Sequence, residues 1–512
     1  MTVVAHKQAP PSEFSLLQPR GEKKKSLNGV SKTQQKKLRG VRMDMTEYER
    51  EREERIRRNR EQLSKLEVPV LVAKRPKVQK SAPASKRKKE EEAPPRRISL
   101  RSRGLAPDGG VAEHAEKAEP VLEPARKRHT GEETLVDISF GGEYDDFEGE
   151  NLAQKKAAYI RKFLELMEDD VLQRVAHLAD RIVEPDSVFA LKLWGEGAEM
   201  KMTERRIYTL SWHPTTSNDI VAAGDNHGNF GLWRADGLEE PSLLQIEPHS
   251  SPITAIRVHL ESPEYMYTSS IDANIRRLDL NKQVFTTVYE DKDEDNINDL
   301  QFIDVNTCAH CTRAGYVGIV DFRASQKLQR EKQLHEKKIA SLSLHTETNM
   351  LVTASNDCTV AIFDLRKIEA GNSLYVFEHK RAVSGAAVSP DGKRIVSTSY
   401  DDFLRVFEES DNGIWYDKPR KYKHDNNTGR WISSFRAEWH PFCPGVFVCG
   451  SKVRPHGVDL FNYEDGGSTL AAHLTSEYMT AIPARHAFHP QTGNLAMGTA
   501  SGRVFLFSDS AI

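Results

Sequence analysis

Cysteine is scarce in this chain, with five residues among 512. So low a content excludes a disulfide framework and is typical of a reducing compartment. Cys308 and Cys311 form a lone C-x-x-C pair. A structural zinc site requires four ligands, and no second pair lies nearby in the sequence. We therefore interpret the pair as two small residues in a buried strand and expect no metal site.

Long apolar runs and a signal peptide are also missing, so we expect a soluble, intracellular protein without a membrane partner. No phosphate-binding glycine loop, no H-E-x-x-H motif and no nucleophile elbow is present. The sequence thus predicts no catalytic residue and no cofactor, and it favours a binding protein over an enzyme.

The charge is small overall but unevenly distributed. The formal net charge is −2, yet residues 1–130 hold 33 Lys and Arg against 18 Asp and Glu, while residues 131–512 hold 40 against 57. A basic segment ahead of an acidic body suggests a negatively charged partner, most often nucleic acid. A solubilising segment with a nuclear-import signal is the alternative, and charge alone does not separate the two.

Residues 1–130 are rich in Lys, Arg, Glu, Pro and Ser, and such a segment cannot bury enough apolar surface to fold alone. We expect a disordered basic arm with one possible helix at 46–66, because Thr46 and Glu49 form a capping box. Basic clusters typical of nuclear import or phosphate binding lie at 23–25, 74–77, 86–89 and 96–104.

Residues 131–184 are predicted to form an acidic linker and an amphipathic helix. From Asn151 to Ile182 the apolar residues recur every three or four positions, which places them on one helical face. Asn151 can cap this helix, and Pro185 is expected to end it. The apolar face could pack on the following domain or bind a partner, and the first alternative is favoured.

From residue 185 to the C-terminus, short strand-like runs repeat with turn residues between them. Seven units end on apolar residues at intervals of about 42 to 54 residues, close to the period of a four-stranded propeller blade. The sequence therefore predicts an all-β fold, a seven-bladed WD-repeat propeller, with a strand within Phe189–Trp194 completing the last blade. The unit ends are Trp233, Leu278, Val320, Phe363, Phe407, Phe461 and Phe507.

Acidic residues recur in the turns of these units, for example Asp225, Asp272 and Asp357. In WD repeats this Asp accepts hydrogen bonds inside the turn, so we assign it a structural role. The third and fourth units end in Val-Asp-Phe-Arg and Phe-Asp-Leu-Arg, and both resemble the W-D-x-R box of propellers that recruit cullin-RING ligase adaptors. An aromatic-Asp pair is common in WD repeats, so chance remains an alternative. The candidate docking residues are Asp321, Arg323, Asp364 and Arg366.

A second candidate site consists of basic and aromatic residues near strand-connecting loops. Their cationic side chains could hold phosphates, and Trp431 could stack on a base. Alternatively, the charges are ordinary solvated loop residues and Trp431 packs in the core. The candidates are Lys201, Arg206, Lys338, Arg430, Trp431, Lys452 and Arg454, with Arg205 and Lys337 beside them.

Three strings carry a family resemblance: K-M-T-E-R-R-I-Y-T-L-S-W-H-P from Lys201, H-D-N-N-T-G-R-W-I-S-S-F-R-A-E-W-H-P from His424, and G-S-K-V-R-P-H-G-V-D-L-F from Gly450. With the T-E-Y-E-R and R-R-I-S-L-R islands of the arm, they resemble the WD-repeat protein 76 family and its fungal relatives. The wider group includes damaged-DNA-binding protein subunit 2.

The resemblance implies nuclear DNA binding, in some members to damaged or modified duplexes, and association with a cullin-RING ligase adaptor. By position, Arg206 and Lys338 match phosphate contacts, residues 424–431 match a loop that wedges into the minor groove, and Arg366 with Asp364 matches the docking box. Gly429 stands where the damage-binding subunit has its wedge aromatic, and Asn226 where it has a lysine. General DNA binding with modest preference is therefore expected.

The sequence thus predicts a non-enzymatic nuclear DNA-binding propeller, acting in the DNA-damage response or in chromatin maintenance. The expected partners are double-stranded DNA, including damaged or modified duplexes, a cullin-RING ligase adaptor and chromatin-associated proteins. The alternative is a protein–protein scaffold whose basic arm only directs nuclear import.

Overall fold

The computed structural model describes residues 126, 128–139, 152–171, 182–193, 198–216, 219–235, 242–325 and 327–508. The possible helix at 46–66 and the basic clusters of the arm lie outside these residues. Within the described ranges, no helix combines the length and apolar character needed to cross a bilayer.

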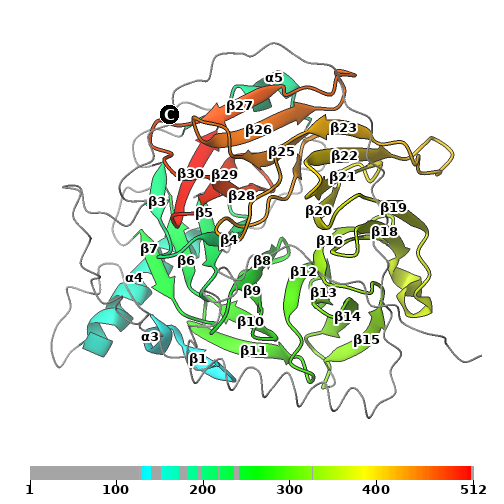
Figure 1. Cartoon of the computed structure of the whole chain (residues 1–512). Helices are drawn as coiled ribbons and strands as arrows, with labels where there is room; N and C mark the ends of the chain where they lie inside the picture. Colours follow the sequence, from blue (N-terminus) through cyan, green and yellow to red (C-terminus); the bar gives the residue numbers. More distant parts are fainter. Residues whose placement is uncertain are drawn as a thin grey trace, which may run out of the picture. The chain divides into compact units, whose positions relative to one another are not determined.

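Seven antiparallel sheets follow one another around a ring, which confirms the seven-bladed propeller (Figure 1). Each blade takes four consecutive strands, numbered here from the innermost to the outermost. The first three blades are β4 (Ile207–Trp212), β5 (Ile220–Asp225), β6 (Phe230–Arg234) and β7 (Leu243–Ile246); β8 (Ile253–His259), β9 (Ser262–Ser270), β10 (Asn274–Asp279) and β11 (Val284–Glu290); and β12 (Ile297–Asp304), β13 (Thr307–Thr312), β14 (Tyr316–Asp321) and β15 (Leu328–Gln333).

The remaining blades repeat this order, and a 3-10 helix, η3 (Leu365–Ala370), follows the third strand of blade 4. Blades 4 to 6 are β16 (Ile339–His345), β17 (Met350–Ser355), β18 (Thr359–Asp364) and β19 (Tyr375–Glu378); β20 (Val383–Val388), β21 (Arg394–Ser399), β22 (Phe403–Glu408) and β23 (Arg420–Lys423); and β24 (Glu438–His440), β25 (Cys443–Ser451), β26 (Gly457–Asn462) and β27 (Ala472–Thr475). Blade 7 begins with β28 (Pro483–Phe488), β29 (Leu495–Thr499) and β30 (Arg503–Ser508).

Strands from before the first blade close the ring. Both β2 (Lys192–Leu193) and β3 (Glu199–Lys201) pair antiparallel with β30, so the outermost strand of blade 7 precedes blade 1 in the sequence. The closing strand expected within Phe189–Trp194 therefore exists as β2, and β3 extends it. Pairing the last strand with an early one leaves β30 without a free edge.

The seven predicted unit ends are all buried in the third strands of their blades, from Trp233 in β6 to Phe507 in β30. The turn aspartates behave as the repeat predicts: Asp225 accepts hydrogen bonds from the backbone N–H groups of His227 and Asn229, at 2.7 and 3.0 Å. Cys308 and Cys311 are buried free thiols in β13, which confirms their interpretation as strand residues.

The segment before the propeller differs from the predicted linker. Residues Glu132–Thr134 form β1, a fifth strand on blade 2 that pairs with β11, and α3 (Leu135–Ile138) follows directly. The amphipathic helix is described as α4 (Leu152–Val171), and residues 172–181 of the prediction lie outside the described ranges. Pro185 does not end that helix but begins a short one, α5 (Pro185–Phe189), where its fixed φ suits the first turn.

The apolar face of α4 packs against the propeller. Ile160 and Phe163 are fully buried in a cluster with Leu135 and the outer strands of blades 1 and 2. The Tyr159 hydroxyl donates to the backbone oxygen of Leu243 in β7, at 2.8 Å. The apolar side chains of α4 are therefore part of the core beneath blades 1 and 2, and the alternative of a free partner-binding face does not apply to them.

Candidate nucleic-acid interface

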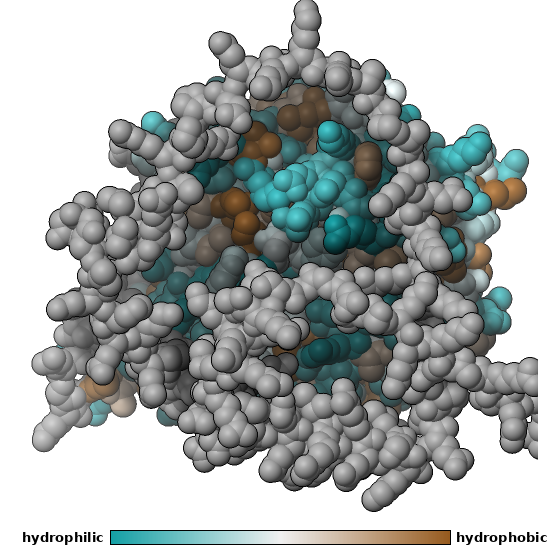
Figure 2. Space-filling view, in the orientation of Figure 1, coloured by the Kyte–Doolittle hydropathy of each residue, from teal (hydrophilic) through white to brown (hydrophobic). Residues whose placement is uncertain are grey.

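Loops of two kinds share one face of the ring. Successive strands of a blade run antiparallel, so the loops that join blade to blade lie on the same side as the loops between second and third strands. We call this side the crossover face. It carries Arg206, Lys338, Arg430, Trp431, Lys452 and Arg454 on its loops, and Lys201 lies at its edge as the last residue of β3. In the view of Figure 2, the described surface near the ring centre is largely hydrophilic, with smaller hydrophobic areas beside it.

The longest blade-to-blade connection on this face, residues 424–437 between β23 and β24, is anchored at its base. The ring nitrogens of His424 contact the Asp459 carboxylate at 3.3 Å and the Asn426 side-chain oxygen at 2.7 Å. Burial works to raise the pKa of Asp459, but hydrogen bonds with His424 and His473 outweigh it and hold the pKa below its usual range. Asn426 also donates to the backbone oxygen of Ser399, at 2.9 Å. The base of the loop is therefore rigidly held.

The tip of this loop carries an exposed aromatic side chain. Trp431 is 79% exposed, so the alternative that it packs in the core is wrong. The Arg430 guanidinium lies 5.9 Å from the centroid of the Trp431 ring. Gly429 has a φ of +62° and open space where a side chain would stand. A planar ring and a cation are thus presented together to solvent, beside a residue that offers no wedge of its own.

Three of the predicted cations converge on this loop from different blades. The Arg206 guanidinium donates to the backbone oxygen of Arg430 at 2.6 Å, and the Ser433 hydroxyl donates to the backbone oxygen of Ile207 at 2.7 Å. Lys452, from the β25–β26 loop, donates to the backbone oxygen of Asn427 at 2.6 Å. The structure therefore brings Arg206, Arg430, Trp431 and Lys452 together.

The other predicted cations are placed differently. Arg454 is exposed on the same loop as Lys452. Lys201 is exposed on the outermost strand of blade 7, opposite Arg503. Lys338 is half-buried; burial lowers its pKa, against the effect of Tyr208, and Arg436 adds to the lowering. Since Tyr208 and Arg436 line a cavity of about 320 Å³ among the innermost strands, Lys338 lies toward this central channel.

Sequence reasoning missed several cations of the crossover face. Lys380 and Arg381 are exposed on the β19–β20 connection, and Arg313 is exposed on the β13–β14 loop. Their positions in the repeat, just before a first strand or just after a second one, could have identified them. The face also carries an acidic loop, Asp291–Asp295, between β11 and β12. Positive charge is therefore concentrated on blades 4 to 7 and on the connection into blade 1.

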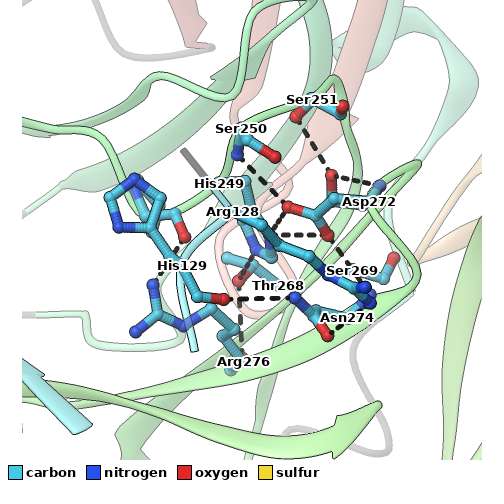
Figure 3. Close-up of polar contacts among 12 residues, drawn as sticks. Arg128, His129, His249, Ser250, Ser251, Thr268, Ser269, Asp272, Asn274 and Arg276 are labelled. Carbon is cyan, nitrogen blue, oxygen red and sulfur yellow. Dashed lines mark hydrogen bonds and ion pairs between the residues drawn. The ribbon is translucent and has the colours of Figure 1, made fainter. Parts of the chain in front are cut away.

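The end of the basic arm is fixed on this face, beside blade 2. Arg126 donates to the backbone oxygen of His227 at 2.9 Å, and Arg128 pairs with Glu290 at 3.2 Å. Figure 3 shows Arg128 and His129 over the turn network of blade 2, in which His249 contacts Thr268 at 2.8 Å and Asp272 at 3.0 Å. The chain therefore joins the propeller on the face that carries the candidate DNA-binding residues.

The predicted docking residues lie on the opposite face, after the third strands of blades 3 and 4. Arg323 contacts both carboxylate oxygens of Asp321 at 3.2 and 3.1 Å, and Arg366 contacts both oxygens of Asp364 at 2.9 and 3.0 Å. These hydrogen bonds lower the pKa of both carboxyls. Asp321 and Arg366 border one hollow of about 410 Å³. Two matching Asp–Arg pairs thus flank a single concavity.

Comparison with known proteins gives a consistent result. The family model "WD domain, G-beta repeat" matches residues 326–364 and 371–408. DNA damage-binding protein CMR1 of Phaeosphaeria nodorum is 32% identical over 92% of this chain and 99% of its own length. DNA damage-binding protein cmr1 of Aspergillus clavatus is 32% identical, covering 84% of this chain and 90% of its own. WD repeat-containing protein 76 of Xenopus laevis is 28% identical, covering 91% and 81%.

Proposed function

Because the chain belongs to the family that includes DNA damage-binding protein CMR1 and WD repeat-containing protein 76, we propose that it is a nuclear DNA-binding propeller protein. In this proposal it acts in the DNA-damage response or in chromatin maintenance and has no catalytic role. DNA lies on the crossover face, and the basic arm, with its import-like clusters, adds affinity and directs the protein to the nucleus.

The observation that carries this proposal is the convergence of Arg206, Arg430 and Lys452 around the exposed Trp431. Three loops that are distant in sequence supply these cations, and their backbone contacts hold them near one ring. Guanidinium and ammonium groups bind phosphates, and an exposed indole stacks on a base without sequence preference. Phosphate contacts without base readout fit general DNA binding with modest selectivity.

The absence of a side chain at Gly429 supports modest rather than tight lesion recognition. A wedge must fill the space left by an extruded base, and Gly429 offers none. Trp431 is exposed two residues later, but it begins from a different backbone position. We therefore favour stacking at a distorted or open site over complete extrusion of a damaged base.

The test is fluorescence-anisotropy binding of the full chain to a short duplex across a salt series. The double variant Arg206→Gln/Arg430→Gln should bind more weakly, and its slope of log affinity against log salt should fall by about 1 for each phosphate that the variant no longer neutralises. Arg323→Gln, on the opposite face, is the matched control. Unchanged affinity and slope in the double variant would favour the scaffold alternative.

A second function is favoured by the paired Asp–Arg clamps on the opposite face. We propose that Asp321, Arg323, Asp364 and Arg366 dock a cullin-RING ligase adaptor, so that the protein serves as a substrate receptor. Both arginine side chains are about two-thirds exposed, and their carboxylate partners orient them beside the hollow between blades 3 and 4. Because DNA and adaptor would use opposite faces, the chain could engage both at once.

A further inference from the structure

Blade 3 departs from its neighbours in the turn network. In blades 2, 4 and 5 a histidine from the preceding connection contacts a hydroxyl on the second strand, as His335 contacts Thr353 at 2.7 Å and His379 contacts Ser397 at 2.8 Å. In blade 3 the residue types are exchanged. Asp291 takes the place of the histidine, since its N–H bonds to the neighbouring turn as those of His335 and His379 do. His310 takes the place of the hydroxyl residue, by the same strand register.

His310 heads a row of residues across three strands. It lies opposite Gly318 of β14, which in turn lies opposite Glu331 of β15. Directly opposed residues share one face of a sheet, so His310 and Glu331 project on the same side. A Cβ on Gly318 would come within 2.3 Å of the His310 ring. The glycine therefore leaves the room through which the imidazole reaches toward Glu331.

Asp291 completes the group from the β11–β12 connection. One ligand atom from each of Asp291, His310 and Glu331 lies within 4.8 Å of the others. The Asp291 carboxylate is oriented by the N–H groups of Asp293 and Asp295, both at 3.0 Å, and by the Tyr289 hydroxyl at 3.2 Å. The ligand atoms thus come from three separate elements, and the surrounding backbone fixes one of them.

The His310 imidazole is fully buried, and neither ring nitrogen has a hydrogen-bond partner. Burial lowers the pKa of His310 to about 4, so the ring is neutral at pH 7 with a free lone pair. A buried polar group without a partner is costly, and such groups in folded proteins call for an explanation. A neutral imidazole facing two carboxylates is the donor set that zinc and similar ions take.

We propose that Asp291, His310 and Glu331 form a binding site for a divalent transition-metal ion, with zinc as the representative ion. The ion would pair the orphan nitrogen and offset the crowding of Glu331 by Asp291, Asp293 and Asp295, which together with burial raises the pKa of Glu331. It would also tie the blade 2–3 connection to β15, a strand whose residues are mostly exposed. The role is structural and independent of DNA binding.

The test uses the full chain, stripped of metal with a chelator and titrated with Zn²⁺ against a competing chromophoric chelator. Glu331→Gln removes an exposed ligand and should leave the fold intact, while weakening the zinc affinity by about tenfold or more. His310→Gln should do the same, and Zn²⁺ should raise the unfolding temperature of the wild type but not of either variant.

Glu378→Gln is the matched control, because Glu378 is an exposed glutamate on the outermost strand of the next blade. It should bind zinc like the wild type, which separates this site from binding at the cysteines or at the arm. Zinc affinity and thermal shift that are equal in the wild type and Glu331→Gln, or no zinc binding by the wild type, would overturn the proposal. Since the readouts involve no DNA, they do not depend on the proposed function.

Discussion

Arg206 donates a hydrogen bond to the backbone oxygen of Arg430 at 2.6 Å, although the two residues are 224 positions apart. The contact joins the connection into blade 1 to the long connection between blades 5 and 6. One cation thereby fixes the loop that presents another. Positive charge on this face is therefore an organised feature of the ring and more than a collection of solvated side chains.

The exposed indole on this loop gives the first prediction. Trp431→Ala should weaken binding to single-stranded or mismatched DNA by about 1–3 kcal/mol, because base stacking on an aromatic ring contributes that much. The unfolding temperature should not change, since Trp431 is 79% exposed. Anisotropy titration measures the effect. Tyr416→Ala, an exposed aromatic on the opposite face, is the control, and equal affinities for both variants would argue against stacking.

The Asp–Arg clamps give the second prediction. The double variant Arg323→Ala/Arg366→Ala should no longer co-purify the cullin-RING adaptor, while keeping the wild-type unfolding temperature, because both side chains are exposed. Co-purification from cells that express the tagged chain is the measurement. Lys282→Ala lies on the same face one blade away, is 73% exposed and should retain the adaptor. Adaptor recovery by the double variant would remove the docking assignment.

The third prediction concerns α4. Phe163→Ala should lower the free energy of unfolding by about 3–5 kcal/mol, because a fully buried aromatic ring is replaced by a cavity. Urea denaturation is the measurement, with the exposed neighbour variant Glu165→Ala expected to match the wild type. A stable Phe163→Ala protein would mean that α4 contributes little to the core. For the same reason, a truncated propeller for binding studies should begin near Ala118, where the compact unit begins, and not at 185.

The fourth prediction concerns acid stability. Burial lowers the pKa of His489 to about 4, against the ordinary value of 6.5. Its Nδ1 accepts the N–H groups of Gln491 and Thr492, both at 3.1 Å, which requires a neutral ring. The unfolded chain gains this proton near pH 6.5 and the folded chain only near pH 4. Stability should therefore decline as the pH falls through this window, by about 1.4 kcal/mol per pH unit from this group.

Urea denaturation at several pH values measures this decline. His489→Gln should reduce the slope by about one proton, whereas His345→Gln, a partly exposed histidine, should leave it unchanged. A slope that is the same in the wild type and His489→Gln would contradict the assignment of a neutral buried ring.

Local patterns account for most of what could be read before the fold was known. A blade is a contiguous run of strands, so the spacing of the buried residues from Trp233 to Phe507 reports the repeat directly. The spacing of apolar residues likewise revealed α4. The pattern was less informative at 131–139, where β1 is a three-residue strand that exists only because β11 offers an edge. So short a strand has no period of its own.

The sequence by itself determined the number of blades, the third strands, the turn aspartates and the buried cysteines, because each depends on residues close together in the chain. Only the tertiary structure decided which cations share the Trp431 loop, that the Asp–Arg pairs flank one hollow, and that His310 faces Asp291 and Glu331. Those relationships join different strands or different blades. They follow from how the ring closes and from the register of its strands, which no local pattern specifies.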